Sequence, residues 1–311
     1  MNRAWCGVTA SFLVISTVWA GNGFSQTASS EARSVVAPGA KLERVQGEFI
    51  FTEGPVTDPE GNVYFTDSRK KRIYIWSIEG KLSVFLEDSR GAVGLDFDRN
   101  GSLLAASTAG RAVLSINLKD KKVSVLADSF HGKQLNSPND LWRDPKGGIY
   151  FTDPRFVTLP YPKEQETEGV YYLSPDRTRL IRVIGDLGKP NGVVGSPDGK
   201  FLYVDDTPED KTYIYTINPD GTLSNKRLFA PTGNDGLTLD SEGNVYITSK
   251  GVDVYTPAGK KIETIPVSPQ PTNVCFGGRD GRTLFITART AAFTLRMRTR
   301  GIAVGKSEER Q

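Results

Sequence analysis

The chain has 311 residues, with 39 basic and 36 acidic side chains and a formal net charge of +3. A charge balance this small gives no reason to expect a nucleic-acid partner. Many glycine, proline, valine, tyrosine and phenylalanine residues indicate strands and tight turns rather than long helices. The length permits two domains, but an all-β ring of this size can also form one unit.

Residues 1–20 have the pattern of a secretory signal peptide. Arg3 supplies the positive end, residues 4–20 are mostly apolar, and Val18-Trp19-Ala20 ends in a small residue suited to cleavage. A membrane anchor is the alternative, although the apolar run is short for a span and contains Ser and Thr. We therefore expect an exported protein, periplasmic or secreted, with no membrane span after cleavage.

The segment that follows the signal peptide, residues 21–40, is rich in Gly, Ser and Ala, and we interpret it as a flexible lead-in. Cys6 would be lost with the signal peptide, which leaves Cys275 as the single cysteine of the mature chain. The mature chain therefore has neither a disulfide framework nor a cysteine-based metal site.

A tight turn followed by a strand rich in β-branched and aromatic residues recurs six times. The copies read DPEGNVYFTD, DRNGSLLAAS, DPKGGIYFTD, SPDGKFLYVDD, DSEGNVYITS and GRDGRTLFIT. Their turn glycines are Gly61, Gly101, Gly147, Gly199, Gly243 and Gly281, at intervals of 40, 46, 52, 44 and 38 residues. Repeats of this period are typical of β-propellers.

Further strand-like runs between the turns bring each repeat to about four strands. The pattern predicts an all-β, six-bladed β-propeller over residues 41–300, with four-stranded antiparallel blades around a central tunnel. The rival fold, a β-helix, has a shorter repeat. We expect residues 41–49 to pair with strands near 293–298 and close the ring, and residues 301–311 to be a disordered tail.

Polar residues recur eight positions before the turn glycines. The six positions are Glu53, Val93, Asn139, Asn191, Asp235 and Asn273, and five of them are polar. Each lies at the start of its blade's innermost strand, so in a propeller all six surround one axis. They could instead satisfy backbone groups as Asx turns.

Two carboxylates and several amide oxygens on one axis would repel each other unless a cation lay between them. Ca²⁺ prefers several oxygen ligands and tolerates irregular geometry, whereas Zn²⁺ usually takes nitrogen or sulfur. The mature chain has one histidine and one cysteine, which argues against a structural zinc site. We therefore predict a Ca²⁺ site in the tunnel, with Zn²⁺, Mg²⁺ or Mn²⁺ as other possible ions.

Several of these segments resemble the SMP-30/gluconolactonase/LRE-like family over residues 45 to 296. They are EGP at 53–55, LNSPNDL at 135–141, KPNGV at 189–193, SPDGKFLYVDDT at 196–207, DGLTLDSEGNVY at 235–246 and PTNVCFGGRDGRTLFIT at 271–287. The resemblance implies a six-bladed propeller with a divalent metal, commonly calcium, held by Glu53, Asn139, Asn191 and Asp235. It also implies hydrolysis of lactones, while relatives cleave organophosphates.

The chain departs from the family pattern around the expected substrate. Val93 stands where members often carry Asn, and Ser137 stands where some sugar-lactone members have Arg. His131 and Gln134 stand where many bacterial members have Glu and Arg. These departures concern the substrate more than the metal.

The loops that follow each second strand, and those that link blades, should surround the entrance. The longest is residues 155–169, a candidate lid or a passive surface insertion. His131, Arg155 and Asn273 are the candidate substrate-binding residues, although His131 could simply be an exposed structural side chain.

In the first, third and fourth repeats, the second strand is expected to end at Asp67, Asp153 and Asp206. For Asp67 and Asp153 we expect hydrogen bonding at the strand end, while the role of Asp206 stays open.

The sequence contains neither a G-x-S-x-G elbow nor a phosphate-binding glycine loop, and one histidine leaves little room for a Ser-His-Asp triad. We therefore predict a metal-dependent lactonase, a carboxylic ester hydrolase that opens a small sugar-type lactone, with Asp235 as both ligand and base. Two alternatives are a phosphotriester or other ester hydrolase at the same site and a non-catalytic ligand-binding propeller with a structural calcium. The sequence gives no basis for an oligomeric state.

Overall fold

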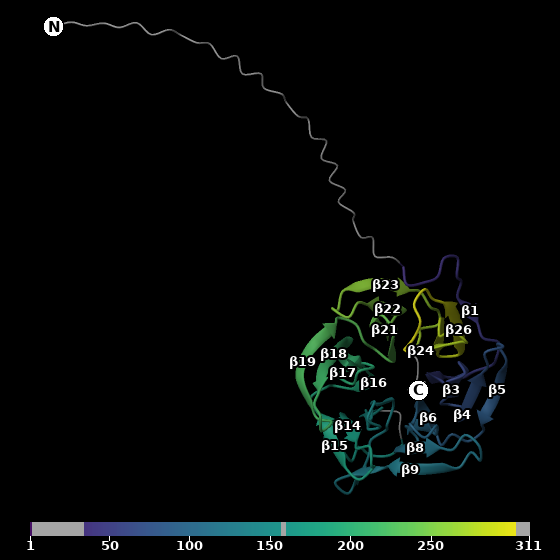
Figure 1. The fold of residues 1–311 in the computed structure, drawn as a ribbon. Coiled ribbons are helices and arrows are strands. Elements are labelled where there is room, and N and C mark those ends of the chain that lie inside the picture. The colour runs from purple at the N-terminus through teal and green to yellow at the C-terminus, as the bar shows by residue number, and fades with distance from the viewer. Residues whose placement is uncertain (2–33, 157–159, 303–311) are drawn as a thin grey trace, which may run out of the picture. The chain divides into compact units, whose positions relative to one another are not determined.

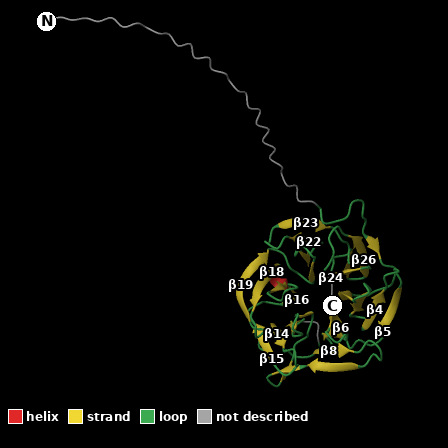
Figure 2. Ribbon diagram, in the orientation of Figure 1, coloured by secondary structure: helices red, strands yellow, loops and turns green. Residues whose placement is uncertain are grey.

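A computed structural model describes Met1 and residues 34–156 and 160–302. The predicted signal peptide and most of the lead-in lie outside the described residues, as do residues 303–311. Across the described ranges the chain forms strands and one 3-10 turn, η1 (Thr207–Glu209) (Figure 2). Within the same ranges, no helix has the length and apolar character needed to cross a membrane.

Six four-stranded antiparallel sheets surround a common centre (Figure 1), which confirms the predicted propeller. Blade one contains β2 (Thr52–Thr57), β3 (Val63–Asp67), β4 (Arg72–Trp76) and β5 (Leu82–Leu86). Blade two contains β6 (Ala92–Phe97), β7 (Leu103–Ser107), β8 (Ala112–Ile116) and β9 (Val123–Ala127). Blade three contains β12 (Leu141–Arg143), β13 (Ile149–Asp153), β14 (Gly169–Leu173) and β15 (Leu180–Ile184).

The remaining blades follow the same order from the centre outward. Blade four contains β16 (Pro190–Gly195), β17 (Phe201–Asp206), β18 (Lys211–Ile217) and β19 (Leu223–Ala230). Blade five contains β20 (Leu237–Leu239), β21 (Val245–Thr248), β22 (Val252–Tyr255) and β23 (Lys261–Ile265). A small hairpin, β10 (Ser129–Phe130) with β11 (Lys133–Gln134), lies in the link between blades two and three.

Blade six joins the two ends of the propeller. It contains β24 (Asn273–Gly277), β25 (Thr283–Ala288) and β26 (Ala291–Arg296), and β1 (Glu43–Arg44) adds the outer strand. β1 pairs antiparallel with β26, with Glu43 opposite Thr294 and Arg44 opposite Phe293. This pairing confirms the predicted closure, which hides a sheet edge that would otherwise remain open.

The six turn glycines all adopt backbone conformations that favour glycine. Their φ angles lie between 67° and 100°. A side chain in this left-handed region is disfavoured, so the glycines allow the tight link between the first two strands of each blade. The spacing found in the sequence therefore reflects one turn repeated in every blade.

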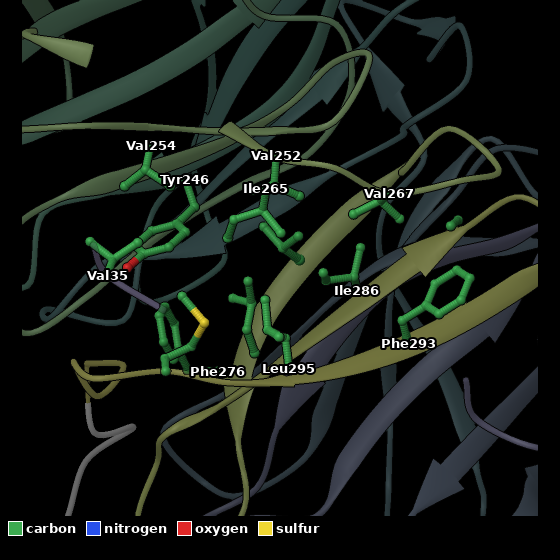
Figure 3. Close-up of a cluster of buried hydrophobic side chains, with 14 of the residues drawn as sticks. Val35, Tyr246, Val252, Val254, Ile265, Val267, Phe276, Ile286, Phe293 and Leu295 are labelled. Atoms are coloured by element: carbon green, nitrogen blue, oxygen red, sulfur yellow. The ribbon is translucent and has the colours of Figure 1, made fainter. Parts of the chain in front are cut away.

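The core lies between neighbouring blades rather than in one central mass. Figure 3 shows the cluster between blades five and six, where Tyr246 and Ile265 face Ile286 and Leu295. Val35 joins this cluster and is 5% exposed. Each blade therefore covers the apolar face of the next, so all six blades of the closed propeller stabilise one another.

Backbone hydrogen bonds connect described residues outside 41–300 to the propeller. The amide of Ala37 donates to the Arg296 carbonyl at 3.0 Å, and the amide of Arg298 donates to the Val35 carbonyl at 2.8 Å. At the other end, the amide of Gly301 donates to the Gly281 carbonyl at 2.8 Å. Residues 34–40 and 301–302 therefore belong to the propeller, because backbone pairing holds them against blades five and six.

Three buried carboxylates fix the entry of the chain into the first strands. Asp67 accepts from the amides of Ile50 and Phe51, Asp153 from those of Asn136 and Ser137, and Asp206 from those of Gly188 and Lys189, at 2.7 to 3.2 Å. The hydrogen bonding expected for Asp67 and Asp153 is confirmed, and Asp206 has the same role. Each carboxylate holds the backbone just ahead of one predicted tunnel residue.

We expect Asp206→Asn to lower the free energy of unfolding by about 1–3 kcal/mol. The asparagine side chain can accept from only one of the two backbone amides that Asp206 binds. Its NH₂ group would face the other amide, which then lacks an acceptor. Urea unfolding measures the change. The control is Asp186→Asn, whose side chain is 66% exposed and should shift stability by less than about 0.5 kcal/mol. Equal stability of the parent and Asp206→Asn would contradict this role.

Candidate metal centre

The six predicted tunnel residues, called the ring below, occupy equivalent places in the blades. Glu53, Val93 and Asn191 are the second residues of β2, β6 and β16, Asn273 begins β24, and Asn139 and Asp235 precede β12 and β20 by two residues. All lie where the chain enters an innermost strand. The register found by counting back from the turn glycines is therefore also the structural register.

Contacts between blades show that ring positions are neighbours in space. The amide of Gly94, next to Val93, donates to the Asn139 carbonyl at 2.8 Å. A Cβ on Gly192 would lie 2.1 Å from the Asp235 carbonyl oxygen, and one on Gly236 would lie 2.0 Å from Asn273 Cγ. The glycines therefore let successive first strands approach closely around the axis.

Irregular strand pairing accompanies the ring in three blades. The pairing register shifts between Glu53 and Val56 in blade one, and between Pro190 and Val193 in blade four. Blade two has the same shift between Ala92 and Leu95. Such bulges turn side chains out of the regular sheet alternation, and here they occur at the residues that surround the axis.

The carboxylates of the ring influence each other electrostatically. Burial raises the pKa of Glu53 well above its usual value, and the Asp235 carboxylate adds to the shift. Burial also raises the pKa of Asp235, followed by the charge of Asp140, while Asn191 and Arg289 oppose the rise. Glu53 is only 5% exposed, whereas Asp235 is partly exposed. The two acids therefore share one poorly solvated space, and Asp235 has the better access to solvent.

Asn191 supplies an oxygen atom without a hydrogen-bond partner. Its Nδ2 donates to the Asn234 carbonyl at 3.2 Å, which orients the amide, and its buried Oδ1 accepts from no described group. An orphaned buried acceptor is costly unless a cation or a donor meets it. The residues present therefore fit a hard cation that takes oxygen ligands.

The donor set is mixed rather than purely acidic. Within residues 34–156 and 160–302, no group of three or more His, Cys, Asp or Glu side chains could hold a metal ion. A cation on this axis would therefore need the asparagine oxygens as well as Glu53 and Asp235. Neutral amide oxygens with two carboxylates suit Ca²⁺ better than Zn²⁺.

Asp140 is a buried acid beside the ring that the sequence analysis did not select. Its carboxylate accepts from the amide of Leu141 at 2.9 Å and from that of Val193 at 3.3 Å, which links blades three and four. Burial raises its pKa to about 7. The corresponding position is glycine in blades one, two, four and five, so this exception was visible in the repeat alignment.

Asp205 is a second acid that sequence reasoning missed. It is fully buried, one of its oxygens has no partner among the described residues, and the other lies 2.6 Å from Thr212 Oγ1. Burial raises its pKa, and the carboxylate of Asp235 contributes. Four sister blades have threonine here, namely Thr66, Thr152, Thr248 and Thr287. Comparing these positions would have revealed the extra acid.

The structure does not bring His131 to the ring. His131 lies in the turn between β10 and β11, is exposed, and stacks on Phe130 with ring centroids 3.9 Å apart. The Phe130 ring in turn faces Arg182, which belongs to the outer strand β15. His131 therefore lies over the perimeter of blade three rather than near the axis.

Arg155 lies at the base of the 155–169 insertion. Its backbone amide donates to Glu168 at 2.8 Å, and its guanidinium donates to the carbonyls of Phe156 and Tyr161. The hydroxyl of Tyr161 reaches the Thr108 carbonyl of blade two at 2.7 Å. The described residues of the insertion are thus docked on neighbouring parts of the propeller.

A cavity of about 440 Å³ lies among the first strands of the six blades. First-strand residues beyond the ring line it, among them Val56, Trp142 and Phe276, and Ile302 contributes from the end of the described chain. Asp140 and Asn273 also line it. The cavity therefore adjoins the ring at Asn273.

Residues 51–290 match the SMP-30/Gluconolactonase/LRE-like region. The chain belongs to this family. It is 29% identical over 293 residues to a gluconolactonase of Zymomonas mobilis, covering 84% of this chain and 82% of that protein. The family match confirms the resemblance found in the sequence.

Solved structures show the same architecture. A gluconolactonase from Xanthomonas campestris superposes with a TM-score of 0.79 at 29% identity, covering 85% of this chain and 91% of its own. A calcium-binding regucalcin from Agrobacterium tumefaciens superposes with a TM-score of 0.71 at 19% identity, covering 84% and 95%. The second likeness supports the fold alone.

Proposed function

We propose that this protein hydrolyses small lactones at the ring, with a divalent cation, Ca²⁺ first, held by Glu53, Asn139, Asn191 and Asp235. The observation that carries the proposal is the ring itself: two interacting carboxylates and the orphaned Asn191 oxygen come from equivalent positions at the start of innermost strands. Kinship to gluconolactonases supports the choice of lactones over other esters.

A bound cation would polarise the lactone carbonyl and offset the negative charge that develops on its oxygen. The protein side chains position both partners. Asn191 is oriented by the Asn234 carbonyl and keeps its buried oxygen available for a cation, and the buried Glu53 would supply a negative charge once the cation is bound. Opening of the lactone adds water across its acyl–oxygen bond and yields a hydroxy acid.

Asp235 is the acid best placed to take the proton of the attacking water. It is partly exposed, so water can reach it, whereas Glu53 is almost fully buried. After the carbon–oxygen bond breaks, the same carboxyl can return the proton to the leaving oxygen. Asp235 therefore returns to its initial protonation state at the end of each turnover.

Ser137 does not contribute a polar group to the entrance. It is fully buried, its amide donates to Asp153, and its hydroxyl donates to the Pro154 carbonyl. A sugar contact from this position is therefore absent, and substrate recognition must come from other residues of the mouth.

A substrate panel tests the proposed activity. Calcium-loaded protein should open small lactones faster than it cleaves simple esters or phosphotriesters. If phosphotriesters are cleaved faster than lactones, the protein is a phosphotriester hydrolase instead. If no substrate of the panel is cleaved, a non-catalytic ligand-binding propeller is favoured.

We also propose that the protein acts outside the cytoplasm after removal of residues 1–20. Expression of the full sequence in a Gram-negative host should yield mature protein that begins at Gly21 and is released with the periplasm. N-terminal sequencing of the released fraction measures this. A full-length, membrane-retained chain would support an anchor instead.

A further inference from the structure

Arg289 lies at the end of blade six that contacts the start of the first strand of blade one. It lies in the two-residue turn between β25 and β26, and its side chain is exposed. Arg289 follows Asn273 by 16 residues, the same interval that separates Arg155 from Asn139. The repeat therefore places it on a loop that follows a second strand, where the entrance lies.

Backbone contacts fix Arg289 beside the ring. Its carbonyl accepts from the Thr52 amide at 2.6 Å and from Thr52 Oγ1 at 3.1 Å, and Thr52 directly precedes Glu53. Its φ of 51° lies in the left-handed region, which is uncommon for a residue with a side chain. The contact with Thr52 holds this conformation against the first strand of blade one.

The guanidinium of Arg289 reaches back toward blade five. Its Nη2 donates to Gln270 Oε1 at 2.9 Å, and Gln270 lies three residues before Asn273 in the link between blades five and six. Its charge also acts on the Asp235 carboxylate. The guanidinium therefore lies at the link between blades five and six, close enough to Asp235 for its charge to act there.

None of the ion pairs among the described residues includes Arg289. Arg279, on the opposite end of the same blade, instead pairs with Glu79 at 2.8 Å. A guanidinium offers five N–H donors in a planar fork, and Gln270 uses one of them. Donors remain for a ligand at the mouth.

We propose that Arg289 is a specificity-determining residue that binds a carboxylate substituent on the lactone substrate. This inference rests on the proposed function and narrows it to anionic lactones, such as those of aldaric acids. The acidic ring repels a free carboxylate, whereas Arg289 at its rim attracts one. The substrate would therefore enter with its lactone carbonyl toward the ring and its carboxylate toward Arg289.

Kinetics with two lactones test this recognition. Glucaro-γ-lactone carries a carboxylate, and glucono-δ-lactone does not. Arg289→Gln should raise KM for the first about 10- to 100-fold, the usual effect of losing a charged hydrogen bond, and change the second by less than about twofold. Arg289→Lys keeps the charge and should retain part of the preference.

The matched control is Arg279→Gln, which removes the same charge from the opposite face of blade six. It should leave both KM values unchanged. An equal loss on both lactones in Arg289→Gln would show a general effect on the site, and no loss on either would show that Arg289 takes no part. Either result overturns the inference.

A binding measurement separates this inference from the proposed activity. Calorimetry with D-glucarate and calcium-loaded protein should show at least about tenfold weaker binding to Arg289→Gln than to the parent. This result would support the anion site even if the parent opened no lactone. Equal glucarate affinity in both proteins, or binding to neither, would contradict it.

Discussion

Replacing Asp235 with asparagine is expected to lower lactone turnover by about 10² to 10⁴-fold, the usual contribution of general-base catalysis. Asparagine keeps one oxygen that can serve as a ligand but cannot accept a proton from water. Asp235 is the carboxylate of the ring with solvent access, so no other predicted ligand can replace it. Steady-state rates on the best lactone of the panel measure the effect.

Cation occupancy must be measured on the same Asp235→Asn sample, because a lost ion would lower turnover equally. Saturating calcium should restore full occupancy while turnover stays low. A fully loaded variant that matches the parental rate would place the base elsewhere. A variant that recovers its rate once it is loaded would reduce Asp235 to a ligand alone.

Glu53→Gln is expected to weaken calcium binding by more than about 100-fold. Mutation of groups that merely support metal ligands costs 10- to 100-fold, so loss of a charged ligand should cost more. Glu53 is buried and interacts electrostatically with Asp235, so its charge acts at short range and with little screening. Calorimetric titration of chelator-treated protein with calcium chloride gives the affinity.

Asp67→Asn is the matched control for Glu53→Gln. Asp67 is a fully buried carboxylate of the same blade, but it accepts from the amides of Ile50 and Phe51 and takes no part in the ring. It should lose stability, and its calcium affinity should fall far less than that of Glu53→Gln, because Asp67 holds the backbone ahead of Glu53 but is not a predicted ligand. Parental affinity in Glu53→Gln, or equal weakening in both variants, would contradict the assigned ligand.

The repeat pattern in the sequence was enough to predict the propeller and its closure. Each turn glycine needs a left-handed backbone, so the six glycines mark the same structural position in every blade. Counting back from them locates the ring because eight residues separate each ring position from its turn glycine, although the paired part of the first strand varies from three to six residues. The register holds even at the bulges near Glu53 and Asn191, which shift pairing but leave the count unchanged.

Side-chain contacts between distant segments could not be predicted in the same way. Arg289 reaches Gln270 across a blade link, and His131 stacks on Phe130 away from the axis, and neither contact has a spacing that a repeat would reveal. Asp140 and Asp205, in contrast, could have been found from the sequence. Asp140 stands where four other blades have glycine, and Asp205 stands where four other blades have threonine. Composition alone did not indicate that Val35, which lies in a polar segment, packs into a core cluster.

Turnover of glucono-δ-lactone by the parental mature protein, measured before chelation, after chelation and after calcium is restored, tests the central claim most directly. We expect activity to disappear with the ion and to return when calcium is added back, because the Asn191 oxygen and the carboxylates of Glu53 and Asp235 would then again share a cation. Unchanged hydrolysis by fully chelated protein would contradict a catalytic cation at the ring, and the absence of hydrolysis by fully loaded protein would contradict the lactonase assignment.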